Sequence, residues 1–340
     1  MTTPGLHYPH ADPPEPGEAR FLAPGVGWLR LPVPGGLRHI NVWLLASGGG
    51  WTLIDTGMDV PAARSAWNGS IGASLDGRPI RRIVCTHHHP DHAGLAVWLA
   101  ARHGAAVQMG AEEYRLMRAV ADAQSRARER LEFWAQTGLG ITAELTPVLT
   151  GEAYARVISG VPAEVLPLAD GELLETDAGP WEIRLLGGHS DGLAVLHQRD
   201  TGMLIASDQV LPRITSNIGC YPERRDPEPL STYLASFAAL EALCAAPLVL
   251  PSHGNVFTGL KFRLGALRAH HASTLANVEG LIVEPRTAAD VARGLFGDRP
   301  DPLNTMLAVA EALAHLRHLV AHGRATTTGD APCFYQRRQA

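Results

Sequence analysis

One short segment constrains this chain more than any other: Thr86-His87-His88-His89-Pro90-Asp91-His92, called here the histidine loop. It matches the spacing HxHxDH in a single register, which selects His87, His89, Asp91 and His92. Alternate residues at the end of an extended strand point the same way, so His87 and His89 can share one metal ion. The turn that follows aims Asp91 and His92 at a second point nearby. This geometry suits two metal ions.

Apolar runs that predict strands come before the histidine loop and before three other metal-ligating side chains. The run Arg82 to Cys85 predicts a strand that leads into the loop, and Ala93 to Arg102 predicts a helix after it. His189, Asp208 and His253 each follow a further apolar run. Loops gather at strand ends, so these three residues are predicted to join the histidine loop.

This ordered pattern resembles the metallo-β-lactamase superfamily over about residues 25 to 260. The resemblance rests on Asp55 in Leu53-Ile54-Asp55-Thr56-Gly57, then the histidine loop, His189, Asp208 and His253. It implies one metal site of His87, His89 and His189 and a second of Asp91, His92 and His253. Asp208 is implied to bridge the two ions. Asp91 and Asp208 are the predicted catalytic residues, and Asp55 is implied to support the ligand loops by hydrogen bonds.

The donor set predicts the metal and the chemistry. Five imidazoles and two carboxylates without a thiolate suit zinc, with iron or manganese as alternative occupants. Two ions that share an oxygen lower the pKa of bound water from about 15.7 toward 7 and polarise a carbonyl or phosphoryl oxygen. The sequence therefore predicts a dinuclear metal-dependent hydrolase that uses a metal-bridging hydroxide.

The order of strands and helices predicts an α/β fold. Two series of apolar strands, each ending in helices, predict two sheets face to face with helices outside, and the family resemblance makes this a four-layer αββα sandwich. Three helices and a β-like tail near the C-terminus predict a winged-helix-like appendage, in which Thr287 is an N-cap. This appendage resembles that of the LACTB2-like branch. The predicted parts are a loose N-terminal arm over 1–24, a catalytic domain over 25–275 with a helical insertion or lid over 111–160, and the winged-helix-like region over 276–340.

Composition narrows the function classes. The formal net charge is −5 and the pI is about 6.3, which argues against nucleic acid as a partner. The four cysteines, Cys85, Cys220, Cys244 and Cys333, form no CxxC pair. The sequence begins without a signal-peptide pattern and holds no long apolar span, so a cytoplasmic protein without a membrane partner is expected.

Several substrate classes remain open at this stage. A small ester, thioester or lactone is the preferred substrate, although the lactonases of the superfamily have a tyrosine where this chain has Leu211. An endoribonuclease or phosphodiesterase is the second candidate, followed by a DNA-binding module with a degenerate metal site and by weak β-lactam hydrolysis. A homodimer is a further expectation.

Tyr221 and Arg213 follow Asp208 in a loop and are candidates for substrate contacts. His88 is expected to point away from the metals and to support the loop. Eight further histidines are assigned no function: His39, His103, His197, His270, His271, His315, His318 and His322.

Overall fold

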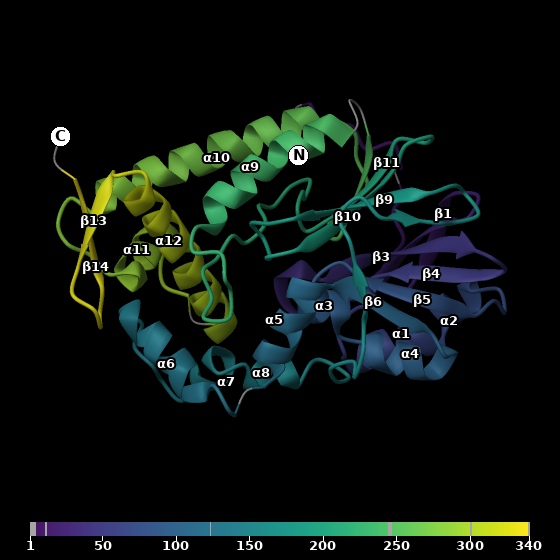
Figure 1. The fold of residues 1–340 in the computed structure, drawn as a ribbon, viewed down its shortest axis with the longest axis horizontal. Helices are drawn as coiled ribbons and strands as arrows, with labels where there is room; N and C mark the ends of the chain where they lie inside the picture. Colours follow the sequence, from purple (N-terminus) through teal and green to yellow (C-terminus); the bar gives the residue numbers. More distant parts are fainter. Residues whose placement is uncertain (1–4, 11, 123, 244–246, 300, 339–340) are drawn as a thin grey trace.

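Two β-sheets pack face to face with helices on their outer sides in the computed structural model, which describes residues 5–10, 12–122, 124–243, 247–299 and 301–338. A helical appendage with a small hairpin extends from one end (Figure 1). The predicted four-layer α/β sandwich with a C-terminal helical appendage is therefore confirmed. Cys244 lies outside the described residues.

The first sheet has seven strands within the described residues, in the order β1-β2-β3-β4-β5-β6-β7. Strands β1 to β4 pair antiparallel, and β4 to β7 pair parallel. The bounds are β1 Ala19–Ala23, β2 Val26–Pro32, β3 His39–Ser47, β4 Gly50–Ile54, β5 Ile80–Cys85, β6 Ala106–Gly110 and β7 Leu166–Leu168. Parallel neighbours require crossover connections, which explains the helices inserted after β4, β5 and β6.

The second sheet has five strands among the described residues, in the order β12-β11-β10-β9-β8. Its strands are β8 Leu173–Leu174, β9 Trp181–Leu186, β10 Leu193–Gln198, β11 Met203–Ser207 and β12 Leu248–Pro251. β10 is antiparallel to both β9 and β11, and β11 is parallel to β12. The carboxyl ends of β9, β11 and β12 therefore lie at one edge.

Helices cover the outer face of each sheet and build the appendage. In Figure 1, α9 and α10 lie over the second sheet, and α1 and α4 lie under the first. The helices are η1 Gly35–Leu37, α1 Pro61–Asn68, α2 Ser70–Ser74, α3 Pro90–Ala93, α4 Ala96–His103, α5 Ala111–Ala121, α6 Ala127–Gln136, α7 Thr146–Leu149, α8 Glu152–Ala155, α9 Pro229–Leu243, α10 Leu260–Leu281, α11 Ala288–Phe296 and α12 Pro302–Ala321. The hairpin of β13 Ala325–Thr328 and β14 Phe334–Arg337 follows α12.

The core between the two sheets is rich in tryptophan. Trp28 and Trp43 of the first sheet and Trp181 of the second are at most 1% exposed and belong to one apolar cluster. Both faces of each sheet are covered, so β4, β10 and β11 are buried along their whole length. This explains why β4 and β11 are mostly apolar in the sequence rather than alternating.

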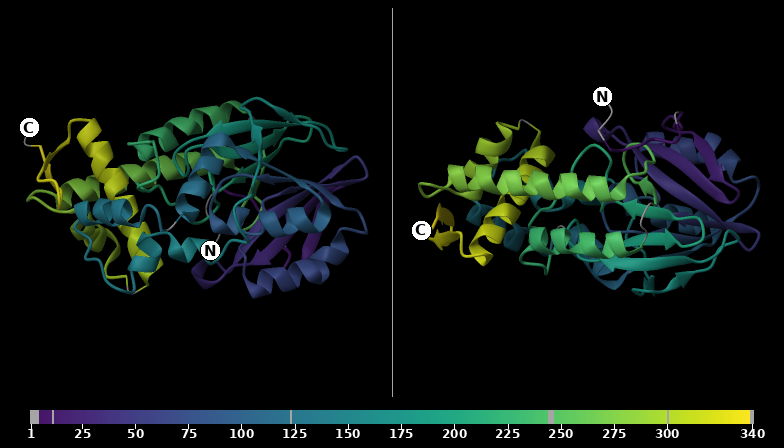
Figure 2. Two further views of the ribbon diagram at one scale, coloured as in Figure 1. Left: turned by 60° about the horizontal axis from the view of Figure 1, so that its bottom comes forward. Right: turned by 90° about the horizontal axis from the view of Figure 1, so that it is seen from above.

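The structure gives the elements at three predicted bounds, and the domain bounds themselves stay predictions. Within the predicted loose arm over 1–24, β1 pairs with β2, and His7 forms a bridge with Thr258, because their backbones reach open edges. The predicted domain boundary at 275/276 falls inside the continuous helix α10, which runs alongside α9 into the appendage (Figure 2). The predicted helix Ala93 to Arg102 is divided into α3 and α4.

The helical segment 111–160 is built into the core as well as covering the surface. Trp134 on α6 is 1% exposed and packs in the same apolar cluster as α9, α10 and α12. Leu149 at the end of α7 lies in that cluster too. Removing this segment would therefore expose the core of the appendage, which an added lid would not do.

The start of α11 agrees with the sequence. Thr287 is the N-cap of α11, and its hydroxyl and the Asp290 carboxylate form a capping box, so that prediction is confirmed. Among the described residues, each helix is too short or too polar to span a lipid bilayer.

Candidate metal centre

All seven predicted ligands lie where strands of the two sheets end. The histidine loop follows β5, His189 follows β9, Asp208 follows β11 and His253 follows β12. β9, β11 and β12 run in the same direction, so their carboxyl ends bring these loops together. The fold thus joins side chains that are up to 166 residues apart in the sequence, from His87 to His253.

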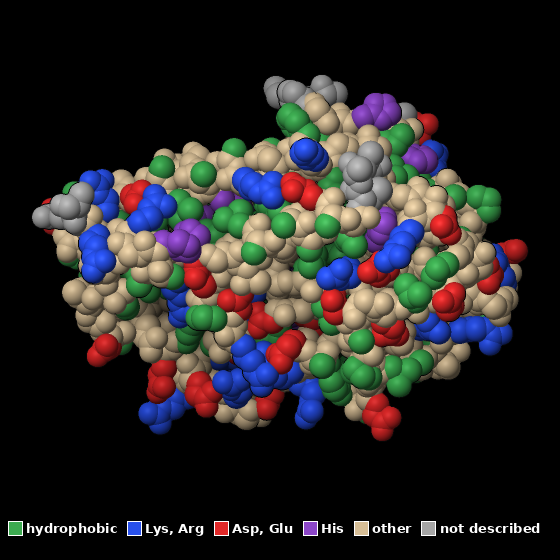
Figure 3. Space-filling model, turned by 45° about the horizontal axis from the view of Figure 1, so that its top comes forward, with side chains coloured by type: hydrophobic (Ala, Val, Ile, Leu, Met, Phe, Trp, Pro, Cys, Tyr) green, Lys and Arg blue, Asp and Glu red, His purple; other side chains and the backbone are tan. Residues whose placement is uncertain are grey.

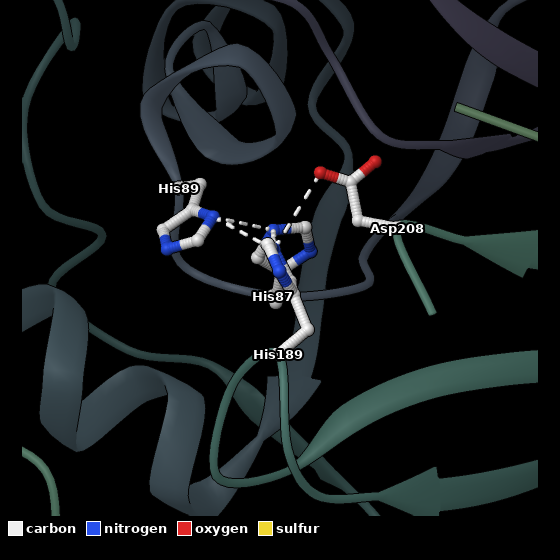
Figure 4. Close-up of side chains that lie close together, drawn as sticks. All are labelled: His87, His89, His189 and Asp208. Carbon is white, nitrogen blue, oxygen red and sulfur yellow. Dashed lines mark hydrogen bonds and ion pairs between the residues drawn. The ribbon is translucent and has the colours of Figure 1, made fainter. Parts of the chain in front are cut away.

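Three histidines and Asp208 form the first cluster, shown in Figure 4. His87 Nε2 lies 2.9 Å from His89 Nδ1, and His189 Nε2 lies 3.3 Å and 3.1 Å from these two nitrogens. Ligand atoms about 2.0–2.1 Å from a tetrahedral ion are about 3.3 Å from one another. The three nitrogens therefore have the spacing of three corners of a zinc site.

Asp91, His92 and His253 form the second cluster. His253 Nε2 lies 3.3 Å from Asp91 Oδ2, and His92 Nε2 lies 3.8 Å from the same oxygen. All three residues are buried. Two imidazoles and a carboxylate in this arrangement are a donor set for a second divalent ion.

The Asp208 carboxylate lies between the two clusters. Its Oδ2 is 3.5 Å from Nε2 of both His189 and His92, and its Oδ1 is 3.6 Å from Nε2 of His253. His92 Nε2 and Asp208 Oδ1 are buried without a hydrogen-bond partner. Buried polar atoms are rarely left so, and ions at the two clusters would satisfy both.

Hydrogen bonds hold the ligand rings from behind. His92 Nδ1 lies 2.8 Å from Asp55 Oδ2, and Asp55 also accepts from the backbone N–H of Thr86 at 2.7 Å. His189 Nδ1 donates to the backbone oxygen of Asn217 at 2.9 Å, and His253 Nδ1 donates to that of His39 at 2.8 Å. A proton held on Nδ1 leaves Nε2 free to bind a metal.

Two residues beside the ligands adopt a strained backbone. Asp55 has φ 63° and Ser207, directly before Asp208, has φ 48°. Residues other than glycine rarely adopt this left-handed region, and such strain gathers at functional sites. The chain is therefore bent sharply at both strand ends, where a supporting carboxylate and a candidate ligand must point into the centre.

The pKa values of the ligands follow from burial and from their neighbours. Burial lowers the pKa of His87 and His89, and neighbouring imidazoles lower it further. Burial opposes ionisation of Asp208, but adjacent imidazoles outweigh it and lower the pKa of its carboxyl group. Burial also opposes charge on His92, but carboxylates led by Asp55 raise its pKa. The lowered pKa values of His87, His89 and Asp208 favour the forms that bind a metal, whereas an ion at His92 would have to displace a proton.

Glu113 on α5 contacts the histidine loop, and sequence reasoning missed it. Its side chain is fully buried and accepts from the backbone N–H of His88 at 3.0 Å and from that of Gly192 at 2.8 Å. It also lies 2.8 Å from His88 Nδ1. In the sequence, Glu113 lies three residues before Leu116 and four before Met117, so it falls on the apolar face of the helix. A carboxylate in that position is the signal that could have identified it.

Tyr154 on α8 supports the same loop. Its hydroxyl donates to the backbone oxygen of His88 at 2.6 Å. Together with Glu113, this bond ties the histidine loop to the helical segment 111–160. His88 turns toward Glu113, away from the first cluster, as expected for a supporting residue.

Tyr221 and Arg213, which were predicted to contact substrate, contact other protein groups. The Tyr221 hydroxyl donates to Asn217 Oδ1 at 2.6 Å, so it braces the loop whose backbone accepts from His189. Arg213 is exposed, and its guanidinium lies 5.8 Å from the ring centroid of Tyr8. Their predicted contact with substrate gains no support from these positions.

Two family profiles match this chain. The profile described as "Metallo-beta-lactamase superfamily" matches residues 35–253. A second profile, "Metallo-beta-lactamase-like, C-terminal domain", matches residues 275–337.

Relatives match nearly the whole chain. The "Probable metallo-hydrolase YqjP" of Bacillus subtilis (strain 168) is 26% identical over 313 residues, 90% of this chain and 96% of that protein. A beta-lactamase domain protein from Burkholderia ambifaria is 34% identical with a TM-score of 0.88 over 98% of both chains. A metallo-beta-lactamase family protein from Thermus thermophilus is 29% identical with a TM-score of 0.81, over 93% of this chain and 100% of that one.

Proposed function

Because this chain belongs to the metallo-beta-lactamase superfamily and is a metal-dependent hydrolase, we propose that it holds two divalent ions and cleaves a small ester, thioester or lactone. The observation that carries the proposal is the arrangement of the seven ligands. Two clusters of donor atoms converge, and the Asp208 carboxylate faces both. Membership of the LACTB2-like branch stays a prediction.

The donor chemistry supports zinc in both positions. His87, His89 and His189 offer nitrogens to one ion, while Asp91, His92 and His253 offer a carboxylate and two nitrogens to the other. Two such ions would supply Lewis acidity, which polarises a carbonyl or phosphoryl oxygen and lowers the pKa of water.

The protein groups around the ligands preserve their geometry. Asp55 and the backbone oxygens of Asn217 and His39 keep the ligand rings in one tautomer and one orientation. Glu113 and Tyr154 hold the histidine loop in place through His88. These hydrogen bonds support the spacing of the donors before substrate binds.

Charge pairing beside the site favours a neutral substrate over a polyanion. Arg224 pairs with Asp191 at 2.7 Å, and Arg115 and Arg225 pair with Glu112 at 2.6 Å and 2.7 Å. Figure 3 shows basic and acidic side chains interspersed on one face of the molecule. Arginines that are already paired offer little to a chain of phosphates, which needs several free cations.

Assay of the metal-replete protein against small esters, thioesters, lactones and phosphodiesters, including single-stranded RNA, tests the proposed substrate class. We expect turnover of an ester, thioester or lactone that disappears after chelation and returns with zinc. Turnover of RNA alone, together with tight and steeply salt-dependent RNA binding, would replace this proposal with the nuclease.

Metal content is a separate prediction. Elemental analysis of the purified protein should approach two metal ions per chain in this centre, chiefly zinc, because two donor clusters are present. An ion count near zero after gentle purification, with no recovery of activity on adding zinc, would contradict it. The metal count is also made on His322→Ala, because His322 belongs to a separate group of metal-ligating side chains. An ion bound by that group is then not attributed to this centre.

Replacing Glu113 with alanine should weaken the metal centre. The backbone of His88 loses a buried acceptor, and loss of partners outside the ligands typically costs about 10- to 100-fold in metal affinity or activity. Competition with a zinc chelator measures the affinity. Glu112→Ala on the same helix is the matched control, because Glu112 forms surface ion pairs. Equal zinc affinity of Glu113→Ala and Glu112→Ala would show that Glu113 has no positioning role.

A further inference from the structure

A third group of metal-ligating side chains lies far from the histidine loop in the sequence, where the appendage meets α9. His318 and His322 stand four residues apart at the end of α12, so both project from one face of the helix. Glu228 directly precedes α9 and faces them. One ligand atom from each of the three lies within 4.8 Å of the others.

The two distances from the Glu228 carboxylate are close to those between ligands of a tetrahedral ion. Glu228 Oε1 lies 3.1 Å from His318 Nδ1 and 3.4 Å from His322 Nδ1. Corners of a tetrahedral zinc site are about 3.3 Å apart. The two imidazole rings stack with centroids 4.0 Å apart and planes inclined by 29°, so both present the same edge to the carboxylate.

One hydrogen bond must change before His322 can bind a metal through Nδ1. Burial and the neighbouring His322 lower the pKa of His318, and the Glu228 carboxylate opposes this shift. His322 Nδ1 lies 2.8 Å from the backbone oxygen of His318, where it donates a proton. A metal at Nδ1 requires that proton to leave Nδ1, and the neutral ring then carries its proton on Nε2.

Neighbouring side chains hold this group in place, and one side of the group is open to solvent. The Ser231 hydroxyl contacts Glu228 and lies 2.9 Å from His318 Nδ1. The nearby Arg324 is held by Glu279 at 2.5 Å, which offsets its repulsion of a cation. The His322 side chain is 50% exposed and that of His318 is 11% exposed, so the group is anchored on one side and open to solvent on the other.

We propose that Glu228, His318 and His322 bind a divalent transition metal ion, best matched by zinc, with water completing the coordination. The ion would link α12 of the appendage to the start of α9, which packs on the second sheet. A donor set of two imidazoles and one carboxylate is a common three-residue zinc site. This site is independent of the proposed catalytic centre.

Zinc counting on the full-length protein tests the site. The protein is stripped by chelation, equilibrated with buffered zinc and analysed for zinc per chain. Wild type should hold one more equivalent than His322→Ala, and His318→Ala and Glu228→Gln should show the same loss. Because the result is a difference, it does not depend on how many ions the catalytic centre holds.

A matched control and a second measurement keep the outcome clear. His270→Ala removes an exposed histidine of α10 outside the group and should keep the wild-type zinc count. Excess zinc should raise the melting temperature of wild type more than that of His322→Ala, since an ion that binds only the folded protein stabilises it. Equal zinc counts for wild type and His322→Ala would overturn the proposal and leave only an ion pair with Glu228. Hydrolytic activity of His322→Ala reports separately on the catalytic centre.

Discussion

Replacing Asp208 with alanine is expected to reduce turnover at least about 100-fold while the fold persists. The carboxylate of Asp208 lies 3.5 Å from Nε2 of both His92 and His189 and 3.6 Å from that of His253. Its removal takes away a carboxylate that faces both clusters. Ions bound there would then be poorly neutralised and free to shift.

The measurement is turnover of the best substrate from the assay, at saturating zinc, for wild type and Asp208→Ala. Asp298→Ala is the matched control, because Asp298 is a surface residue with a 90% exposed side chain. Circular dichroism and the melting temperature establish that both variants are folded. Wild-type turnover in a folded Asp208→Ala protein would exclude the bridging role.

The second large effect concerns stability: Arg130→Met should lower the free energy of unfolding by about 3–5 kcal/mol. The Arg130 side chain is 2% exposed, and its Nε lies 2.5 Å from Glu223 Oε1. Its guanidinium also donates to the backbone oxygens of Thr150 and Ala119. Methionine fills part of the space but leaves a buried carboxylate and two backbone acceptors without their partner.

Denaturant unfolding followed by tryptophan fluorescence measures this loss. Arg128→Ala on the same helix is the control, since the Arg128 side chain is 91% exposed and its surface pair with Glu132 is screened by solvent. The double variant Arg130→Met/Glu223→Leu should recover part of the stability, because no unpaired charge remains buried. A loss below about 1 kcal/mol for Arg130→Met would show that the pair is dispensable.

The Arg130 network also bears on the predicted lid. It joins α6 to the ends of α5 and α7 and to the loop before α9, within the segment 111–160 and beyond it. Glu113 and Tyr154 tie the same segment to the histidine loop. A role of these helices in selecting substrate stays a prediction, but point substitutions on their exposed faces test it better than removal of the segment.

The sequence alone determined the candidate ligands and the fold class of this protein. His87, His89, Asp91 and His92 are close in the chain, so their spacing and the preceding strand already predict how they converge. The apolar runs before His189, Asp208 and His253 place these residues at strand ends, where parallel strands bring loops to one edge. Local patterns of this kind also predicted the N-cap at Thr287, since a capping box spans only four residues.

Apart from Asp55 and His88, only the tertiary structure decided which groups support those ligands. His253 depends on the backbone of His39, 214 residues earlier, and a backbone oxygen leaves no mark in a sequence. Glu113 and Arg130 appear as ordinary charges on amphipathic helices until packing buries them beside a partner. His318 and His322 lacked a third donor in their own segment, and the contact between α12 and the start of α9 supplies Glu228. Pairings across such distances depend on how the layers pack, which residue spacing along the chain does not specify.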